Sequence, residues 1–344
     1  MATFDMIDTL EQLSLLSGVS GCEDEVRDAI CTLLEGHCDY RVDALGNVIA
    51  RKKGRTTPKN RILLSAHMDE VGFIITYIDD NGFLRFSTVG GIDNRVIAGK
   101  AVVIGKNHVP GVIGAKATHQ VPASEREEPI SPDKLYIDIG ATSKEEALSL
   151  VRLGDRAAYV APFQRFGQDK IMGKAFDDRA GCVMMLDMIY SDLAYDCTFS
   201  FTVQEENGCI GGTTAAYGVD PDIGIAVETT TASDIGGTSP DKVVCKQGDG
   251  AAVSFMDKGT AYDGDLFRRV FEVAEKNNLP CQAKAGVYGG TEGRVIQTAK
   301  AGARALTISL PCRYLHTPSN MLQISDIHNT RKLLELAVEE FANL

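Results

Sequence analysis

The sequence predicts an α/β fold in which a small β-rich module interrupts a larger α/β domain. The apolar run at residues 62–64 has the length of a buried strand and leads into His67 and Asp69. From residue 71 to residue 159 the chain changes to short strand patterns separated by glycines, and an α/β pattern returns at residue 172. The length of 344 residues also suggests about two domains.

Two helices and a hairpin are expected before the first buried strand. Apolar residues recur at helical spacing over residues 4–16 and again over residues 23–34, where acidic residues occupy the first turn. Residues 17–21 are expected to form the loop between them. Residues 40–43 and 47–51 lie on either side of a Leu-Gly pair and predict a β-hairpin.

The β-rich module contains several strand patterns and one helical pattern. Strands are expected over residues 73–75, 83–86, 102–104 and 112–114. The polar, proline-containing segment 125–132 predicts an exposed loop, and residues 143–153 predict an amphipathic helix. The pattern is that of an all-β module inserted between the two halves of an α/β domain.

In the second half of the α/β domain, three predicted strands each lead into a carboxylate or a histidine. The strands cover residues 197–203, 223–227 and 304–310, and they lead into Glu205-Glu206, Glu228 and His316. Helices are expected over residues 182–190, 262–277 and 324–343. Because ligands of open α/β sheets bind outside the carboxyl ends of the strands, these side chains are candidates for a functional site.

Composition and charge disfavour several classes of partner and location. A net charge of −12 argues against binding to nucleic acid or to an anionic membrane. No stretch approaches the roughly 18 uninterrupted apolar residues of a membrane span. The N-terminal residues include acids and lack the basic region of a signal peptide. The nine cysteines contain no Cys-x-x-Cys pair, which favours reduced thiols in a cytoplasmic protein over disulfides or a structural zinc site.

His67 and Asp69 form the first candidate pair. Residues two apart on an extended chain point to the same face, so the two side chains are expected to lie side by side where the strand ends. A carboxylate that accepts one ring N–H of a histidine fixes its tautomer and makes the other nitrogen a better metal ligand. The alternative for this pair alone is a hydrogen-bonded core histidine beside an Asp in a turn.

Two further pairs of neighbouring carboxylates are candidates. Asp178 is explained as a helix cap, but Asp177 is not, and it could be the shared carboxylate between two ions about 3.5–4 Å apart. Adjacent carboxylates such as Glu205 and Glu206 raise each other's pKa unless a cation intervenes. A metal resolves this conflict when one Glu binds it and the other serves as the general base. A solvated acidic turn is the alternative for this pair.

Glu228 and His316, each taken alone, are more typical of structural roles. Their positions at strand ends, beside the other candidates, favour a shared site instead. Imidazole and carboxylate ligands together suit zinc, cobalt or manganese. The sequence therefore predicts a two-metal hydrolase.

Four ordered segments resemble the signature segments of a peptidase family. They are SAHMDEVG at residues 65–72, KAFDDRAG at 174–181, VQEENG at 203–208 and YLHTPS at 314–319. With these segments, and with SGVSGCEDEV at residues 17–26, nearly the whole chain is similar to the TET-type dinuclear metallo-aminopeptidases. That family includes the bacterial glutamyl and deblocking aminopeptidases, some of which carry endoglucanase names.

The resemblance implies two divalent metal ions per subunit, zinc, cobalt or manganese. The implied ligands are His67, Asp177, Glu206, Glu228 and His316. Among them His67 and Glu228 would bind one ion, Glu206 and His316 would bind the other, and Asp177 would bridge both.

The resemblance also implies two catalytic residues that do not bind metal. Asp69 would orient His67, and Glu205 would be the general base and acid. The chain departs from the family at two positions. Glu228 stands where the family often has Asp, and Glu292 ends a Gly-Gly-Thr-Glu segment that is usually Gly-Gly-Thr-Asp.

The family fold implies a three-layer catalytic domain with a mixed sheet, of the aminopeptidase/phosphorylase type, formed by residues 1–69 and 163–344. Residues 70–162 would form a PDZ-like dimerisation domain, and dimers would assemble into a tetrahedral dodecamer. The implied function is an aminopeptidase that trims short peptides. The alternatives are another two-metal amidohydrolase (a carboxypeptidase or an N-acyl amino-acid deacylase), a glycosidase that needs no metal, and an inactive assembly scaffold.

Arg294 is a candidate for substrate selection. It follows the glycine-rich segment 289–293, whose backbone could approach a ligand closely, and its planar fork suits a carboxylate. If it faces the pocket, acidic N-terminal residues would be favoured. The alternative is a surface Arg or one paired with Glu292.

Overall fold

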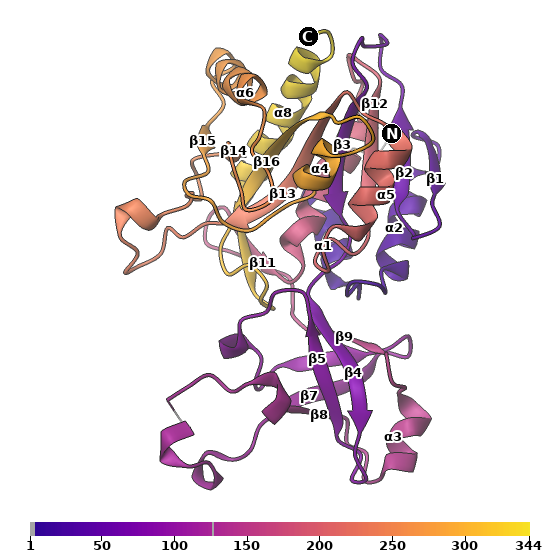
Figure 1. Cartoon of the computed structure of the whole chain (residues 1–344), viewed down its shortest axis with the longest axis vertical. Coiled ribbons are helices and arrows are strands. Elements are labelled where there is room, and N and C mark those ends of the chain that lie inside the picture. Colours follow the sequence, from indigo (N-terminus) through magenta and orange to yellow (C-terminus); the bar gives the residue numbers. More distant parts are fainter. Residues whose placement is uncertain (1–3, 126) are drawn as a thin grey trace.

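The computed structural model describes residues 4–125 and 127–344 and consists of a large α/β part and a small barrel (Figure 1). Residues 1–3, and residue 126 in the predicted loop 125–132, lie outside the described residues. Within the described chain the main sheet has eight strands. In spatial order they are β1 (Asp39–Val42), β2 (Val48–Lys52), β12 (Cys197–Thr202), β3 (Ile62–His67), β13 (Ile223–Thr231), β16 (Arg304–Cys312), β14 (Ala251–Ser254) and β15 (Cys281–Ala283).

The main sheet is mixed, as the fold class predicted. Strands β12, β3, β13 and β16 are parallel neighbours, whereas β2 and β14 join this group in antiparallel fashion. All six residues of β3 are buried. A parallel strand covered on both faces has no solvent side, which explains why its sequence is a continuous apolar run rather than an alternating one.

Helices cover both faces of the main sheet and complete three layers. On one face, α4 (Phe176–Tyr190) and α8 (Ile324–Phe341) contact each other and the central strands, and α1 (Met6–Leu15), α2 (Asp24–Leu34) and α6 (Gly264–Lys276) pack on them. On the other face lie α5 (Ile210–Val219) and α7 (Gly293–Gln297). The packing of α7 on β13 is so close that a Cβ at Gly224 would lie 2.2 Å from Ile296 Cγ2.

The predicted helices are confirmed, with ends that differ by at most three residues, except that α4 begins at Phe176, six residues before the predicted start at residue 182. Capping fixes two of their starts. The Asp5 carboxylate accepts hydrogen bonds from the backbone N–H groups of Ile7 and Asp8, and Asp263 caps α6 in the same way. By contrast, α5 was not predicted. Its sequence contains three glycines, which disfavour a helix, so packing against β3 and β12 must stabilise it.

The barrel is formed by the segment that interrupts the α/β pattern. Its strands are β4 (Gly72–Ile78), β5 (Leu84–Val89), β6 (Ala101–Ile104), β7 (Val109–Gly114), β8 (Tyr136–Asp138) and β9 (Arg156–Tyr159), and α3 (Lys144–Leu150) contacts β4. The barrel encloses its own apolar cluster, which includes Phe73, Ile113 and Ile137. That residues 70–162 act as a dimerisation domain stays a prediction.

A short sheet joins the segment before Asp177 to the segment after His316. Strand β11 (Lys170–Gly173) pairs with β10 (Gln164–Phe166) and with β17 (Asn320–Gln323), and Gly173 lies opposite Asn320. This pairing holds the start of α4 beside the turn that carries His316. Among the helices of the described chain, none is both long and apolar enough to cross a membrane.

Candidate active site

The predicted site residues meet at one end of the main sheet. Six of the seven line a cleft of about 510 Å³, namely His67, Asp177, Glu205, Glu206, Glu228 and His316. The seventh, Asp69, is fully buried beside His67. The strand ends differ from the prediction at Glu228, because β13 continues to Thr231 and Glu228 lies within the strand.

Asp177 lies between the two imidazoles. Its Oδ1 is 3.5 Å from His67 Nε2, and its Oδ2 is 3.1 Å from His316 Nε2. Two further carboxylates complete the arrangement. Glu228 Oε2 is 3.8 Å from His67 Nε2, and Glu206 Oε1 is 3.1 Å from His316 Nε2. One carboxylate shared by two histidines, each with a carboxylate of its own, is the layout expected of two neighbouring cation sites.

Asp178 also belongs to this group, although the sequence indicated only a helix cap. Its Oδ1 does accept the capping hydrogen bond from the Gly181 N–H, at 3.1 Å. Nevertheless its side chain is fully buried, and potential ligand atoms of Asp178, His67 and Glu228 all lie within 4.8 Å of one another. The same holds for His67, Asp177 and Glu206. Asp178 is therefore an additional candidate ligand.

Without a bound cation, keeping the carboxylates of the cleft ionised costs free energy. Burial, with smaller contributions from Glu206 and Asp69 and against the opposing effect of His67, raises the pKa of Glu205 to about 8. Burial likewise raises the pKa of Glu206, and it raises the pKa of Glu228 well above the usual range. The group thus holds more negative charge than its two histidines neutralise.

The histidines respond in the opposite direction. Burial acts to lower the pKa of His316, but hydrogen bonding to Asp177 and Glu206 outweighs it and raises the pKa to about 11. The same balance raises the pKa of His67, through Asp177 and Asp69. The imidazole nitrogens and the carboxylates thus face one another across the positions where a divalent cation would be bound.

In the described structure, buried carboxylate oxygens of the cleft that lack a partner are also positioned to bind cations. Two buried carboxylate oxygens of this group, Asp178 Oδ2 and Glu228 Oε1, have no hydrogen-bond partner, and Asp177 Oδ1 and Glu206 Oε1 face only the imidazole nitrogens of His67 and His316. Buried polar atoms are normally satisfied, so two orphans in one cleft require an explanation. With two imidazoles and several carboxylates, the donor set suits divalent zinc, cobalt or manganese.

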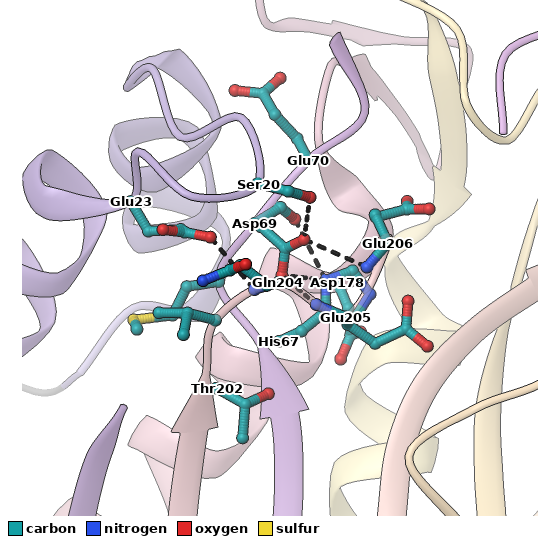
Figure 2. A network of polar contacts seen from close by, with 12 residues as sticks. Ser20, Glu23, His67, Asp69, Glu70, Asp178, Thr202, Gln204, Glu205 and Glu206 are labelled. Atoms are coloured by element: carbon teal, nitrogen blue, oxygen red, sulfur yellow. Dashed lines mark hydrogen bonds and ion pairs between the residues drawn. The ribbon is translucent and has the colours of Figure 1, made fainter. Parts of the chain in front are cut away.

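Asp69 connects His67 to the turn that carries the paired glutamates (Figure 2). Its Oδ1 accepts from the Glu205 N–H at 2.9 Å, and its Oδ2 accepts from the Glu206 N–H at 3.1 Å. Ser20 donates its hydroxyl to the same Oδ2 at 2.5 Å. His67 Nδ1 lies 3.5 Å from Asp69 Oδ1 and 3.1 Å from the Asp69 carbonyl, so Nδ1 faces Asp69 and Nε2 faces the cleft.

A second loop supports the same turn. The Glu23 carboxylate accepts from the backbone N–H groups of Gly21 and Gln204, at 2.6 Å and 3.1 Å. Neither Ser20 nor Glu23 was predicted as a site residue. The signal that could have identified them is the segment at residues 17–26, which resembles the family but contains no metal ligand.

His316 is oriented by the barrel. Its Nδ1 is 2.7 Å from the carbonyl oxygen of Gly91, which follows β5. A neutral or protonated His316 donates Nδ1–H to this carbonyl, and Nε2 then faces Asp177 and Glu206. The neighbouring Gly90 packs against Glu206, since a Cβ at Gly90 would lie 3.3 Å from the Glu206 side chain. The inserted segment thus contacts two side chains that line the cleft, His316 and Glu206.

Arg294 does not line the cleft among the described residues. Its Nη2 donates to the carbonyl of Gly208 at 2.7 Å, on the exposed surface. The pairing with Glu292 that the sequence left open is also wrong, because Glu292 is fully buried and accepts the hydroxyl of Ser65 at 2.5 Å. Arg294 lies on the exposed side of α7, whereas Glu292, at the N-cap of the same helix, is buried.

The comparisons with known proteins agree on one protein family. Residues 46–333 match the family model described as M42 glutamyl aminopeptidase. A provisionally named aminopeptidase of Acetivibrio thermocellus is 40% identical over 337 residues, which are 97% of this chain and 98% of that protein.

Two solved structures share the whole fold. An aminopeptidase from the archaeon Desulfurococcus kamchatkensis superposes with a TM-score of 0.92 at 34% identity, over 98% of this chain and 95% of that chain. The TET1 peptidase of Pyrococcus horikoshii, which can assemble into a tetrahedron or a large octahedral shell, has a TM-score of 0.86 at 35% identity, over 96% and 98%. The chain therefore belongs to the M42 glutamyl aminopeptidase family and is a peptidase.

Proposed function

We propose that this peptidase is a two-metal aminopeptidase that removes N-terminal residues from short peptides. The observation that carries the proposal is the position of Asp177, with one oxygen toward His67 and the other toward His316. The cleft around it is open enough for a peptide terminus, at about 510 Å³.

The metal sites would be built from the residues that the sequence singled out. His67 and Glu228 would hold one divalent ion, Glu206 and His316 would hold the other, and Asp177 would be shared. The close approach of Asp178 to His67 and Glu228 makes it a further ligand or a direct neighbour of the first ion. When bound, the two ions would supply Lewis-acid polarisation of the scissile carbonyl and of the attacking water.

Glu205 would move the proton. It lines the cleft, its backbone N–H is fixed by Asp69, and Cys209 Sγ donates to its Oε1 at 3.2 Å. Its carboxylate would take the proton of the attacking water and deliver it to the leaving amine. Placing the base directly before the ligand Glu206, on one anchored turn, would fix the distance between base and metal.

The excess of carboxylates would select a free N-terminus. An α-ammonium or α-amine can donate to several carboxylates of the cleft, whereas an N-acylated terminus has lost the charge and most of its donors. This contrast separates an aminopeptidase from an N-acyl amino-acid deacylase.

The proposal predicts that leucine p-nitroanilide is hydrolysed in the presence of added zinc, cobalt or manganese and that its N-acetylated form is not. The measurement is release of p-nitroaniline by the metal-reconstituted protein, with a chelator-treated sample as the control. Equal hydrolysis of the acetylated substrate would indicate a deacylase, and activity on glycosides that survives the chelator would indicate a glycosidase.

We also propose that residues 70–162 mediate self-association, first into dimers and then into a tetrahedral dodecamer. The assembly of the TET1 peptidase of Pyrococcus horikoshii supports this. So do exposed apolar side chains on and after α3, at Leu148, Leu150 and Leu153. Removing the whole segment would be a poor test, because the contact of the Gly91 carbonyl with His316 would be lost as well.

Surface substitution is the sharper experiment. Leu148→Glu combined with Leu153→Glu is expected to yield a smaller species, because charges at an apolar interface cannot be desolvated cheaply. Light scattering would measure the mass, and Leu15→Glu, at an exposed leucine of α1, is the matched control. An assembly of unchanged mass in the double variant would remove this surface from the interface.

A further inference from the structure

Ser20 is a buried serine in the loop between α1 and α2. Only 2% of its surface is exposed, and its hydroxyl donates to Asp69 Oδ2 at 2.5 Å. The loop runs beside the residues that follow β3, because the Ser20 N–H donates to the Glu70 carbonyl and the Glu70 N–H donates to the Gly18 carbonyl. Ser20 is not among the described residues that line the cleft, so its direct contact with the site is through Asp69.

The Asp69 carboxylate joins Ser20 to the turn of the paired glutamates (Figure 2). Besides the Ser20 hydroxyl, it accepts from the Glu205 N–H at 2.9 Å and from the Glu206 N–H at 3.1 Å. Because Asp69 is fully buried, bulk solvent does not reach this carboxylate and protein donors must satisfy it. A hydroxyl that donates to an ionised carboxylate forms one of the shorter and stronger hydrogen bonds in proteins.

The Ser20 hydroxyl differs from the other close donors to Asp69 in its origin. A carboxylate held only by the two N–H groups of one turn can move together with that turn. Ser20 belongs to a different loop, so its hydroxyl fixes the carboxylate relative to the rest of the domain. His67 Nδ1 also faces Asp69, but at the longer distance of 3.5 Å from Oδ1.

The barrel holds Ser20 from the other side. Arg156, the first residue of β9, donates from Nε to the Ser20 carbonyl at 3.0 Å and from Nη1 to the Gly154 carbonyl at 2.8 Å. The neighbouring Gly21 has a φ of +79°, and a Cβ there would lie 3.1 Å from Arg156 Nη2. The guanidinium therefore packs directly on the backbone of the loop, and a continuous series of hydrogen bonds leads from the barrel to the turn of the paired glutamates.

We propose that Ser20 is a positioning residue, which fixes the Asp69 carboxylate and, through it, the general base Glu205. Arg156 of the barrel holds Ser20 in place. The inference rests on the proposed aminopeptidase function, in which Glu205 moves the proton. It gives the loop at residues 17–21, which contains no candidate metal ligand, a role in the reaction.

The first test is Ser20→Ala, assayed on an aminoacyl p-nitroanilide with the metal-reconstituted protein. We expect kcat to fall about 10- to 100-fold, because a misplacement of about 1 Å at a reacting group can cost about 100-fold. Ser325→Ala is the matched control, since the Ser325 hydroxyl also donates to a carboxylate, that of Asp169 at 2.6 Å, away from the cleft. The control should keep the kcat of wild type. An unchanged kcat in Ser20→Ala would overturn the assignment.

Arg156→Met tests the contact with the barrel. It should lower kcat less, about 3- to 10-fold, because the Ser20 backbone keeps its hydrogen bond to Glu70. Arg165→Met is the control, since it also removes an arginine that joins two elements, through the Asp8 carboxylate. Equal kcat in Arg156→Met and Arg165→Met would remove Arg156 from the assignment.

A double-mutant cycle separates positioning from a general loss of stability. If Ser20 acts through the base, adding Ser20→Ala to Glu205→Gln should lower the residual kcat by less than about threefold, because the effects of coupled residues do not add. If Ser20 only stabilises the fold, its loss should multiply with that of Glu205→Gln. The multiplied loss would contradict the inference.

Amide hydrogen exchange gives a readout that needs no turnover. The N–H groups of Glu205 and Glu206 both donate to Asp69, so a peptide covering residues 203–208 should exchange about 10-fold faster in Ser20→Ala. Peptides from α8 should exchange as in wild type. If wild type hydrolyses no aminoacyl substrate, the aminopeptidase proposal fails, and the exchange rates still decide whether Ser20 holds this turn. Equal exchange of residues 203–208 in the two proteins would refute that role.

Discussion

Glu205→Gln is expected to fold, to bind metal and to lose about 10²–10⁴-fold in kcat, the usual contribution of a general acid–base group. Glutamine has the shape of glutamate and can still accept the weak hydrogen bond from Cys209. It cannot take a proton from water. The adjacent Glu206 keeps its carboxylate near His316, so the loss should appear in turnover rather than in metal content.

Three measurements together test the role of Glu205. These are kcat on an aminoacyl p-nitroanilide, metal content by elemental analysis, and thermal unfolding. Glu23→Gln is the matched control, since it changes a buried glutamate that supports the same turn and keeps an oxygen for the N–H groups of Gly21 and Gln204. Its loss should be much smaller. If kcat of Glu205→Gln stayed within a few fold of wild type, another group would have to be the base.

His67→Ala and His316→Ala are each expected to lose metal. Each change removes an imidazole and leaves several buried carboxylates to repel one another. Loss of an outer-shell partner typically lowers metal affinity about 10–100-fold, and loss of a ligand should lower it further. Elemental analysis after dialysis, and metal titration by calorimetry, would measure the loss. His328→Ala, at an exposed histidine of α8, is the control and should keep its metal. Full occupancy in both site variants would refute the ligand assignment.

Substitutions at Gly90 and Gly91 would test whether the barrel helps to position the proposed metal ligands. Gly90 has a φ of +79°, and a Cβ there would lie 2.7 Å from Val71 and 3.3 Å from Glu206. Gly90→Ala should therefore displace Glu206 and weaken metal binding. A Cβ at Gly91 would lie 3.7 Å from His316 Nδ1, an ordinary contact, so Gly91→Ala should bind metal nearly as wild type does. Equal affinity in the two variants would mean that this loop does not position the ligands.

Local patterns were sufficient for the part of the site that lies on single strands and their ends. The period of two residues on a strand places His67 and Asp69 together, and the structure has them in contact through Nδ1. The continuous apolar run of β3 correctly indicated a buried strand, and the structure shows that both of its faces are covered. The carboxyl ends of parallel strands meet at one edge, which is why residues far apart in sequence could be predicted to share a cleft.

Local sequence patterns did not predict the features that depend on tertiary packing rather than on secondary-structure propensity. The sequence of α5 is rich in glycine and threonine and contains no clear helical stripe, yet contacts with β3 and β12 make it a helix. Asp178 was assigned only as a cap because capping is visible from sequence. Its burial beside Glu228 depends on strands that lie elsewhere in the chain.

The sequence by itself determined the class of fold, the strands that lead to the candidate site residues, and the residue types that two divalent cations would need. It could not determine which basic side chain lines the cleft. Arg294 and Lys284 both lie near glycine-rich loops, and only the tertiary structure directs Arg294 to the surface and Lys284 into the cleft. Nor could it place the Gly91 carbonyl against His316, 225 residues away. Such contacts depend on how separate elements pack, and no local periodicity encodes that.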